Sequence, residues 1–273
     1  MSVSTDWARP LVSAYSLVRR SGFLQTSLGR RLFKSAYFLY KRYLEDDLQE
    51  LLQAFPALVG EGNALDIGAN IGYTAAVLAR SIKSSRKVFA FEPEPFNFEI
   101  LQQIARQPEF KGKIIPTRCA VGAENGTIDL WINLRHHADH RVLTEQFHSD
   151  HPGSTGIRTP LITMDSFLQN EQGGVSFVKI DVQGYELAVC QGMQDILRKN
   201  PEVAIVLEFM PLAMRELGFN PSHLLDFFWD RGFEVYVVCR GGKLSRGMPT
   251  PENDSSYFDL LFSRRPVAHH PGT

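Results

Sequence analysis

The stretch that most constrains the fold of this chain is residues 64–74, which read ALDIGANIGYT. An apolar run is followed by two glycines, Gly68 and Gly72, and then by the alanine-rich residues 75–79. This order predicts a buried strand, a tight turn and a helix, because glycine lets the backbone turn sharply and approach a ligand closely. The free N–H groups at the start of the helix favour a polar or anionic group. We therefore expect an α/β sheet with a ligand site at this turn.

The turn differs from the dinucleotide-binding pattern G-x-G-x-x-G. Asn70 takes the middle position, and Asp66 precedes the first glycine. An acid at this point favours a ligand with an ammonium group, such as S-adenosylmethionine, over a pyrophosphate. We predict that Asp66, Gly68, Asn70 and Gly72 bind this cofactor. A plain turn after an α/β strand is the alternative interpretation.

The next apolar run, residues 87–91, ends at Glu92, an acid 24 residues after Gly68. An acid at the end of the second strand of a nucleotide-binding unit can accept hydrogen bonds from both ribose hydroxyls. We therefore predict that Glu92 binds the ribose of the cofactor. Pro93 and Pro95 follow it, so a solvated carboxylate at a helix N-terminus is the alternative.

Residues 113–120 read as a third strand that ends in small residues. Ala120 and Val121 at this end would let an adenine ring lie against the backbone, and we include them in the predicted cofactor site. A plain strand end explains the same residues equally well.

The second informative stretch is residues 175–186, VSFVKIDVQGYE, which predicts a buried strand, a glycine turn and a helix. Ligands of open parallel sheets lie outside the carboxyl ends of the strands, so Asp181 is expected beside the ligand. Lys179, two residues earlier, lies on the same face of the strand as Asp181. A buried lysine needs an acid partner, which Glu186 or Asp181 could provide. The alternative is an ion pair that only joins sheet to helix.

The remaining residues continue the alternation of strands and helices. Apolar spacing predicts helices over 96–104, 187–197 and 221–229, a strand end with a short helix over 161–168, and strands over 128–132, 203–209, 233–238 and 257–262. Glu208, near the end of one of these strands, is expected to face the same crevice. The glycine- and proline-rich residues 241–254 contain no motif that we can interpret.

Composition limits the classes of function. With 273 residues, 44% of them apolar, the chain can bury one sizeable core. A net charge of −1 gives no electrostatic reason to expect a nucleic-acid partner. The cysteines, Cys119, Cys190 and Cys239, are few and widely spaced, as is typical of reduced thiols in a cytoplasmic protein. No run is long enough for a membrane span or resembles the core of a signal peptide.

Outside the core we expect three further segments. Residues 1–58 are predicted to form a basic helical cap before a catalytic domain at 59–265, and residues 266–273 are predicted to be a disordered tail. A basic amphipathic segment such as 1–55 can instead contact a membrane surface or a lipid-linked substrate, or mediate oligomerisation.

Residues 133–160 are expected to form a loop or lid. Five of the eight histidines lie there, namely His136, His137, His140, His148 and His151. A solvated polar loop and a lid that supplies one catalytic or substrate-binding histidine both fit this pattern. No dedicated metal site is predicted, because only His136 and His140 have helical ligand spacing, and their surroundings lack helical periodicity.

Three motifs in this order closely resemble the FkbM family of S-adenosylmethionine-dependent methyltransferases. They are LDIGANIG at 65–72, FEP at 91–93 and VKIDVQGYE at 178–186, and VLEF at 206–209 fits the same pattern. The resemblance covers about residues 62–210. It implies a Rossmann-like, seven-stranded class I methyltransferase sheet whose last strand runs antiparallel. It also implies O-methylation, often of sugar or polyketide hydroxyls.

The family signature then maps onto individual residues. The cofactor loop corresponds to Asp66, Gly68, Asn70 and Gly72, the ribose acid to Glu92, and the Lys-x-Asp-x-x-Gly-x-Glu signature to Lys179, Asp181, Gly184 and Glu186. The N-terminal segment and the histidine-rich loop contain none of these family motifs, so we expect acceptor choice to depend on them.

The resulting hypothesis is methyl transfer to a hydroxyl of a sugar, glycan or natural-product acceptor. Such a hydroxyl needs its proton removed. We expect Asp181, which would also touch the cofactor, to be the base or to hold the acceptor hydroxyl, with Lys179 and Glu186 fixing its geometry. His137 or His140 is the second candidate. A further hypothesis is that Asp181 and Glu208 together bind a Mg²⁺ ion, which would lower the pKa of the acceptor hydroxyl.

Two other functions remain open at this point. A nicotinamide-dependent oxidoreductase would use the same fold, although the third glycine of its fingerprint is missing. A non-catalytic cofactor-binding scaffold would also keep the fold, but the intact acids Asp66, Glu92 and Asp181 argue for a working site.

Overall fold

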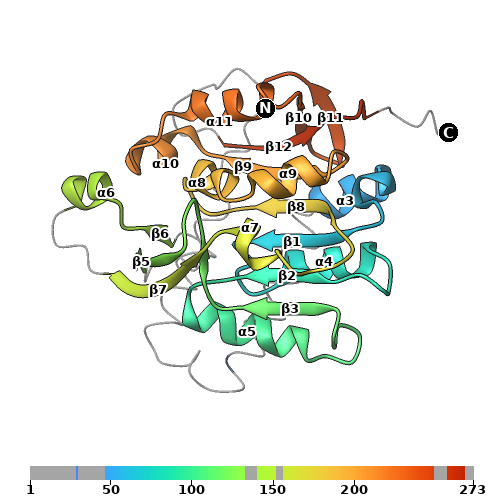
Figure 1. Ribbon diagram of the computed structural model, residues 1–273, viewed down its shortest axis with the longest axis horizontal. Helices are drawn as coiled ribbons and strands as arrows, with labels where there is room; N and C mark the ends of the chain where they lie inside the picture. Colours follow the sequence, from blue (N-terminus) through green and yellow to red (C-terminus); the bar gives the residue numbers. More distant parts are fainter. Residues whose placement is uncertain (1–28, 30–46, 133–139, 152–155, 249–256, 268–273) are drawn as a thin grey trace.

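The centre of the protein is an eight-stranded sheet in the order β11-β10-β12-β9-β8-β1-β2-β3 (Figure 1). The computed structural model describes residues 29, 47–132, 140–151, 156–248 and 257–267. The strands of this sheet are β1 (Asn63–Ile67), β2 (Val88–Phe91), β3 (Ile114–Thr117), β8 (Val175–Ile180), β9 (Ala204–Phe209), β10 (Glu234–Cys239), β11 (Lys243–Arg246) and β12 (Phe258–Ser263).

The directions of the strands show at which edge of the main sheet a ligand is expected to bind. Strands β3, β2, β1, β8 and β9 pair in parallel. Strand β12 is antiparallel to both β9 and β10, as the resemblance implies. The sheet has eight strands rather than the seven expected, because β11 pairs antiparallel with β10. Leu244 is the single apolar residue of β11, so a strand in residues 241–254 gave no periodic signal.

Helices cover both faces of the sheet (Figure 1). On one face, Ala64 and Val88 belong to a buried apolar cluster with side chains of α3, α4 and α5. On the other face, Leu65 and Phe89 cluster with side chains of α8, α9 and α11. Neighbouring residues alternate between the faces, as in strands buried on both sides. The helices are α3 (Asp47–Ala54), α4 (Tyr73–Ser81), α5 (Pro95–Ala105), α8 (Glu186–Gln191), α9 (Gln194–Lys199) and α11 (Pro221–Trp229).

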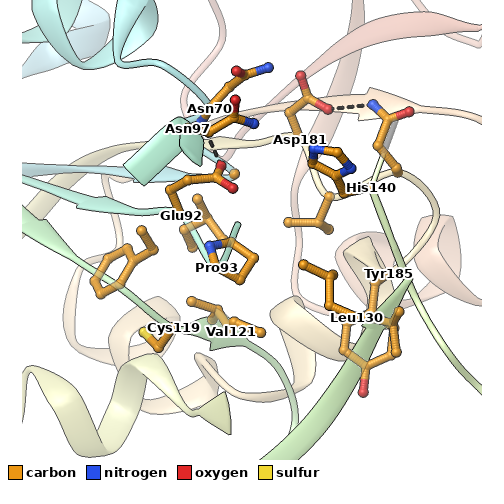
Figure 2. Close-up of a pocket in the computed structure, with 17 residues that line it drawn as sticks. Asn70, Glu92, Pro93, Asn97, Cys119, Val121, Leu130, His140, Asp181 and Tyr185 are labelled. Carbon is orange, nitrogen blue, oxygen red and sulfur yellow. Dashed lines mark hydrogen bonds between the residues drawn. The ribbon is translucent and has the colours of Figure 1, made fainter. Parts of the chain in front are cut away.

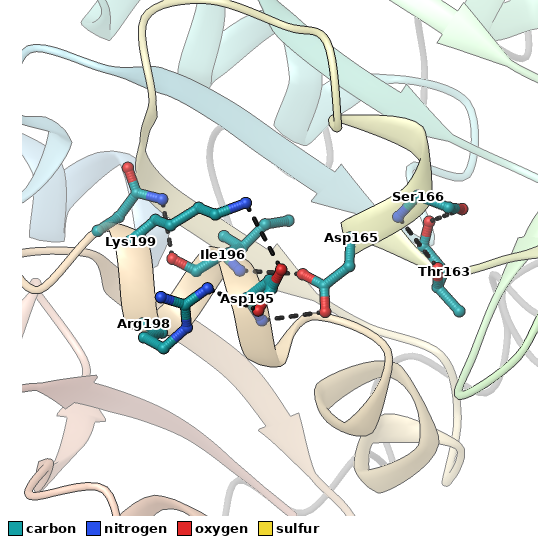
Figure 3. A network of polar contacts seen from close by, with 8 residues as sticks. Thr163, Asp165, Ser166, Asp195, Ile196, Arg198 and Lys199 are labelled. Carbon is teal, nitrogen blue, oxygen red and sulfur yellow. Dashed lines mark hydrogen bonds and ion pairs between the residues drawn. The ribbon is translucent and has the colours of Figure 1, made fainter.

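The helix predicted over 187–197 is divided into α8 and α9 at Gly192. A Cβ at Gly192 would lie 1.9 Å from the carbonyl oxygen of Gly122, so only glycine allows this close approach. The second of these helices, α9, is capped at its N-terminus by a residue of α7 (Met164–Phe167). The Asp165 carboxylate accepts hydrogen bonds from the backbone N–H groups of Asp195 and Ile196, at 3.0 and 2.9 Å (Figure 3).

A second, four-stranded sheet stands beside the ends of β1, β2 and β3 (Figure 1). Its order is β4-β7-β5-β6, with β4 (Ala120–Val121), β5 (Gly126–Trp131), β6 (Arg141–Val142) and β7 (Gly156–Ile162). The short helix α6 (Glu145–Asp150) lies between β6 and β7. A loop or lid was expected over 133–160; the described part of this segment contains β6, α6 and the start of β7, so the expectation of an irregular loop was wrong there, and a lid stays a prediction.

Part of the predicted N-terminal cap belongs to the main core. Leu51 and Leu52 of α3 and Leu58 of the 3-10 helix η3 (Pro56–Val59) are buried in the same cluster as the sheet. Residues 1–28 and 30–46 of the cap lie outside the described residues, as do His136, His137 and residues 268–273. Within the described part of the chain, no helix has the length and apolarity needed to span a bilayer.

Candidate functional site

A cavity lies where the carboxyl ends of β1, β2 and β8 meet the second sheet (Figure 2). Open parallel sheets bind their ligands at this position. The predicted site residues that line it are Gly68, Asn70, Glu92, Ala120, Val121, His140 and Asp181. Those that lie outside its lining are Asp66, Gly72, Lys179 and Glu186. The structure thus brings most of the predicted cofactor residues together and places the other acids and the lysine elsewhere.

The loop after β1 takes three left-handed conformations in five residues. Gly68, Asn70 and Gly72 have φ values of 84°, 49° and 87°. A Cβ at Gly68 would lie 1.8 Å from the carbonyl oxygen of Asp181, so a larger residue would separate the loop from the end of β8. The glycine therefore brings the loop and the Asp181 backbone together at one wall of the cavity.

Glu92 is fixed by the same loop. Its Oε2 accepts a hydrogen bond from the backbone N–H of Asn70 at 2.8 Å, and its Oε1 accepts one from Glu94 at 2.9 Å. Each carboxylate oxygen has a second lone pair, so both can still accept a hydroxyl. Burial, with Glu94 and Asp66 nearby, raises the pKa of Glu92 to about 8, although the two backbone hydrogen bonds oppose the rise.

Asp66 does not line the cavity. Its side chain is on the face of β1 that packs against α4, and the residue is 1% exposed. Burial raises the pKa of Asp66 to about 7, with Asp181 adding to the rise and Lys179 opposing it. A contact between Asp66 and the ammonium group of a ligand therefore stays a prediction, and its position fits support of the loop from behind.

The turn after β8 is organised by Glu186, at the start of α8. Its Oε1 accepts hydrogen bonds from the backbone N–H groups of Gly184 at 3.0 Å and Val182 at 3.3 Å. A Cβ at Gly184 would lie 2.7 Å from the Ala213 carbonyl carbon and oxygen. Burial raises the pKa of Glu186 to about 7. Glu186 thus shapes the backbone next to Asp181 without touching the carboxylate.

Lys179 pairs with an acid that sequence reasoning missed. Its Nζ lies 2.7 Å from Asp259 Oδ1, on β12, and not beside Glu186; Asp181, the other expected partner, acts on Lys179 through its charge. Burial by itself lowers the pKa of Lys179, but the negative charges of Asp259, Asp181 and Glu208 together raise it above its usual value. The one signal for this pairing in the sequence is a lone acid within the apolar strand FDLLFS.

Gln183 is a second residue that the sequence did not single out. It lines the cavity and has a left-handed φ of 54°, which is uncommon for a residue other than glycine. Its Nε2 donates to Asp181 Oδ1 at 2.8 Å (Figure 2) and to Glu208 Oε2 at 2.9 Å. Its place in a V-Q-G turn beside the predicted base was the available clue.

The second sheet closes the other side of the cavity. Leu130 of β5 and Val142 of β6 line it, as does His140, which directly precedes β6, and Figure 2 shows the His140 ring on the same side as Asp181. Cys119 also lines the cavity, and burial raises the pKa of its thiol to about 12, so the thiol stays protonated. Burial also raises the pKa of Tyr185 in the wall. The other titratable side chains of the wall are Glu92, Asp181 and His140, and these are the candidates to bind or move a proton.

The Mg²⁺ hypothesis finds no support in the described part of the chain. No group of three or more histidine, cysteine, aspartate or glutamate side chains there could hold a metal ion. Asp181 and Glu208, the two expected ligands, are joined by the Gln183 amide. A side-chain amide thus occupies the bridging position that the hypothesis gave to the ion.

The lining of the cavity fits S-adenosylmethionine in its chemistry. The Glu92 carboxylate can accept hydroxyl groups, and Phe91, Ala120 and Val121 offer an apolar surface for a ring. The volume of the cavity is about 70 Å³. Ligand pockets are typically about 300–1,000 Å³, so we expect the walls to separate when a whole cofactor binds.

Comparison with known proteins also points to a methyltransferase. The family described as Methyltransferase FkbM domain matches residues 66–235, more than half of the chain. Hexuronic acid methyltransferase AglP of Haloferax volcanii is 33% identical over 136 residues, which are 49% of this chain and 50% of that protein. The chain thus matches about half the length of this curated relative.

Two solved structures are similar at lower identity. Methyltransferase FkbM from Methylobacillus flagellatus has a TM-score of 0.47 and 16% identity, over 74% of this chain and 43% of that one. An O-methyltransferase from Bacillus cereus, solved with S-adenosylhomocysteine, has a TM-score of 0.47 and 12% identity, over 81% and 80% of the two chains. The family match rests on the stretch that contains the loop, Glu92, Asp181 and Glu208. On that match, the chain belongs to the FkbM methyltransferase domain family.

Proposed function

We propose that the protein is an S-adenosylmethionine-dependent O-methyltransferase that acts on a hydroxyl of a sugar-containing acceptor. The observation that supports this most directly is one cavity lined by the left-handed loop, Glu92 and Asp181. Glu92 would accept the ribose hydroxyls, and Ala120 and Val121 would lie against the adenine. Hexuronic acids are the first acceptor class to test, because the curated relative bears that substrate in its name.

The chemistry divides between the cofactor and the chain. The bound cofactor supplies an activated methyl group on a sulfonium, so the protein mainly aligns the acceptor oxygen. The methyl–sulfur bond and the acceptor O–H bond break as the new C–O bond forms, the thioether leaves, and the proton needs a base. Asp181 would take this proton, because it lines the cavity and one of its oxygens is held by Gln183. His140 is the second candidate, and His137 lies outside the described residues.

Isothermal titration with S-adenosylmethionine and S-adenosylhomocysteine tests the cofactor assignment. We expect wild type to bind both, and Glu92→Ala to bind them at least about tenfold more weakly, because two hydrogen bonds to ribose are lost. Asp66→Ala tests whether the acid below the loop is needed as well. Binding of NADH with no binding of either sulfur compound would instead favour an oxidoreductase.

Methyl transfer is then measured with methyl β-D-glucuronide and methyl β-D-glucoside as probe acceptors. We expect product with wild type and a loss of about 10²–10⁴-fold in Asp181→Asn, which keeps the shape but not the basicity of the side chain. Activity of Asp181→Asn near wild type would reject Asp181 as the base. Cofactor binding without product over a broad panel of hydroxyl acceptors would favour a non-catalytic scaffold.

A further inference from the structure

A row of charged side chains crosses four strands of the main sheet behind the cavity. In the strand register, Asp66 of β1 lies opposite Lys179 of β8, and Glu208 of β9 lies opposite Asp259 of β12. Lys179 Nζ reaches across β9 to Asp259 Oδ1 at 2.7 Å. Asp181 follows at the end of β8, two residues after Lys179 and on the same face. Four carboxyl groups therefore share one lysine.

The charges in this row do not balance if every acid is ionised. Like charges at short distance in a buried place disfavour each other, so such a group of carboxyls retains a proton. The lysine charge is bonded to Asp259, the acid at the far end of the row from Asp66. Burial raises the pKa of Glu208 well above its usual value, and the neighbouring carboxylates of Asp181 and Asp259 raise it further, against the opposing effect of Lys179.

The Gln183 amide connects the row to the cavity. Both N–H bonds of Nε2 are directed to carboxyl oxygens, one to Asp181 at 2.8 Å and one to Glu208 at 2.9 Å. The residue holds this position with a left-handed φ of 54°. Such backbone conformations cost free energy and are found at functional sites more often than elsewhere. The amide thus joins an acid in the cavity wall to an acid behind it.

We propose that Asp181, Gln183 and Glu208 form one hydrogen-bonded unit in which Glu208 carries the proton, Asp181 carries the negative charge and Gln183 is the positioning residue between them. The part of this inference that concerns catalysis rests on the proposed function. A neutral Glu208 leaves Asp181 as the charged acid that faces the cavity. The Gln183 amide fixes one oxygen of that acid and leaves the other for the acceptor proton.

Infrared difference spectroscopy of the full chain near neutral pH tests the proton without any cofactor or acceptor. A protonated carboxyl has a C=O stretch that a carboxylate lacks. We expect Glu208→Gln to remove one such band from the wild-type spectrum while the melting temperature stays close to wild type, because glutamine resembles the neutral acid. Glu109→Gln is the matched control, because Glu109 is exposed and its side-chain bond to Arg80 lowers its pKa. If Glu208→Gln removes no acid band, the proposal is wrong.

Gln183→Met and Gln183→Gly test the positioning residue. Both remove the amide, but glycine relieves the left-handed backbone, so this variant keeps the fold if methionine does not. We expect both to move the Glu208 band to higher wavenumber, because its carbonyl loses a hydrogen-bond donor. An unmoved band in both would overturn the role of Gln183. Titration of the wild-type sample with S-adenosylhomocysteine, together with the methyl-transfer assay, separately tests the proposed function.

Discussion

At the scale of single residues, Gly68 shows how one missing side chain positions the site. A Cβ there would lie 1.8 Å from the Asp181 carbonyl oxygen, and φ is 84°. Gly112 is the matched control, because its φ is 76° but a Cβ there meets nothing within 4 Å. We expect Gly112→Ala to cost about 1–2 kcal/mol for the backbone alone, and Gly68→Ala to cost several kcal/mol more. Urea unfolding of both variants measures the difference, and equal costs would show that the close approach is not needed.

The raised pKa of Glu186 predicts how the stability of the protein depends on pH. Burial raises its pKa from 4.5 to about 7, so the native state holds a proton that the unfolded state has lost. The free energy of unfolding should therefore fall as pH rises through this window, by up to about 1.4 kcal/mol per pH unit for each such proton. Glu186→Gln keeps an acceptor for the Gly184 N–H and cannot ionise, so we expect a smaller fall. Parallel stability curves for the two proteins between pH 4.5 and 7 would contradict this assignment.

The sequence identified the residues that come from local motifs. Gly68, Asn70, Glu92 and Asp181 follow strand ends, and strand ends of a parallel sheet meet at one edge, so they could be placed together without a structure. Asp259 could not be placed in this way. Its pairing with Lys179 joins positions 80 residues apart and depends on the register of an antiparallel strand.

At the scale of elements, the apolar runs predicted the main strands because parallel strands buried on both faces have continuous apolar sequences. The second sheet was harder to predict. Strand β6 has two residues, and it pairs with β5 at Leu130 and Trp131. Such short, half-exposed strands depend on partners distant in the sequence. The same reason applies to β11, which is held by β10 and not by an apolar pattern of its own.

An ion pair joins the second sheet to the main body, and we expect it to hold the second sheet in place. Arg141 of β6 binds Glu216 of α10 (Pro211–Glu216), and their side chains are 16% and 33% exposed. Arg141→Met should leave the Glu216 charge partly buried, and should speed amide hydrogen exchange in β6 and α6 by about tenfold, or about 1.4 kcal/mol.

Arg158→Met is the matched control for that exchange measurement. The Arg158–Asp129 pair lies within the second sheet, and its side chains are 71% and 42% exposed. Exposed pairs contribute about 0–1 kcal/mol, so exchange in α6 should change little. A similar acceleration in both variants would show that Arg141 has no special role in holding the sheet in place.

At the scale of the whole molecule, the second sheet forms one wall of the cavity and the main sheet the other. The main-sheet wall is built from buried strands and from a loop fixed by Glu92, whereas β6 is short and partly exposed. Because the volume of the cavity is about 70 Å³, we expect one wall to move when a cofactor binds. Local stability is lowest where few apolar contacts are buried, so the movement should occur in the second sheet.

Hydrogen exchange with and without S-adenosylhomocysteine tests which wall moves. We expect β1, β2 and β8 to exchange slowly in both states, because their backbones are buried in the centre of the main sheet. We expect β5 and β6 to exchange at a different rate once the ligand is bound, because Leu130 and Val142 line the cavity that has to open. Glu92→Ala should abolish the change if the ligand occupies this cavity. Ligand-dependent exchange confined to the loop after β1, with β5 and β6 unchanged, would instead show that the main-sheet side opens.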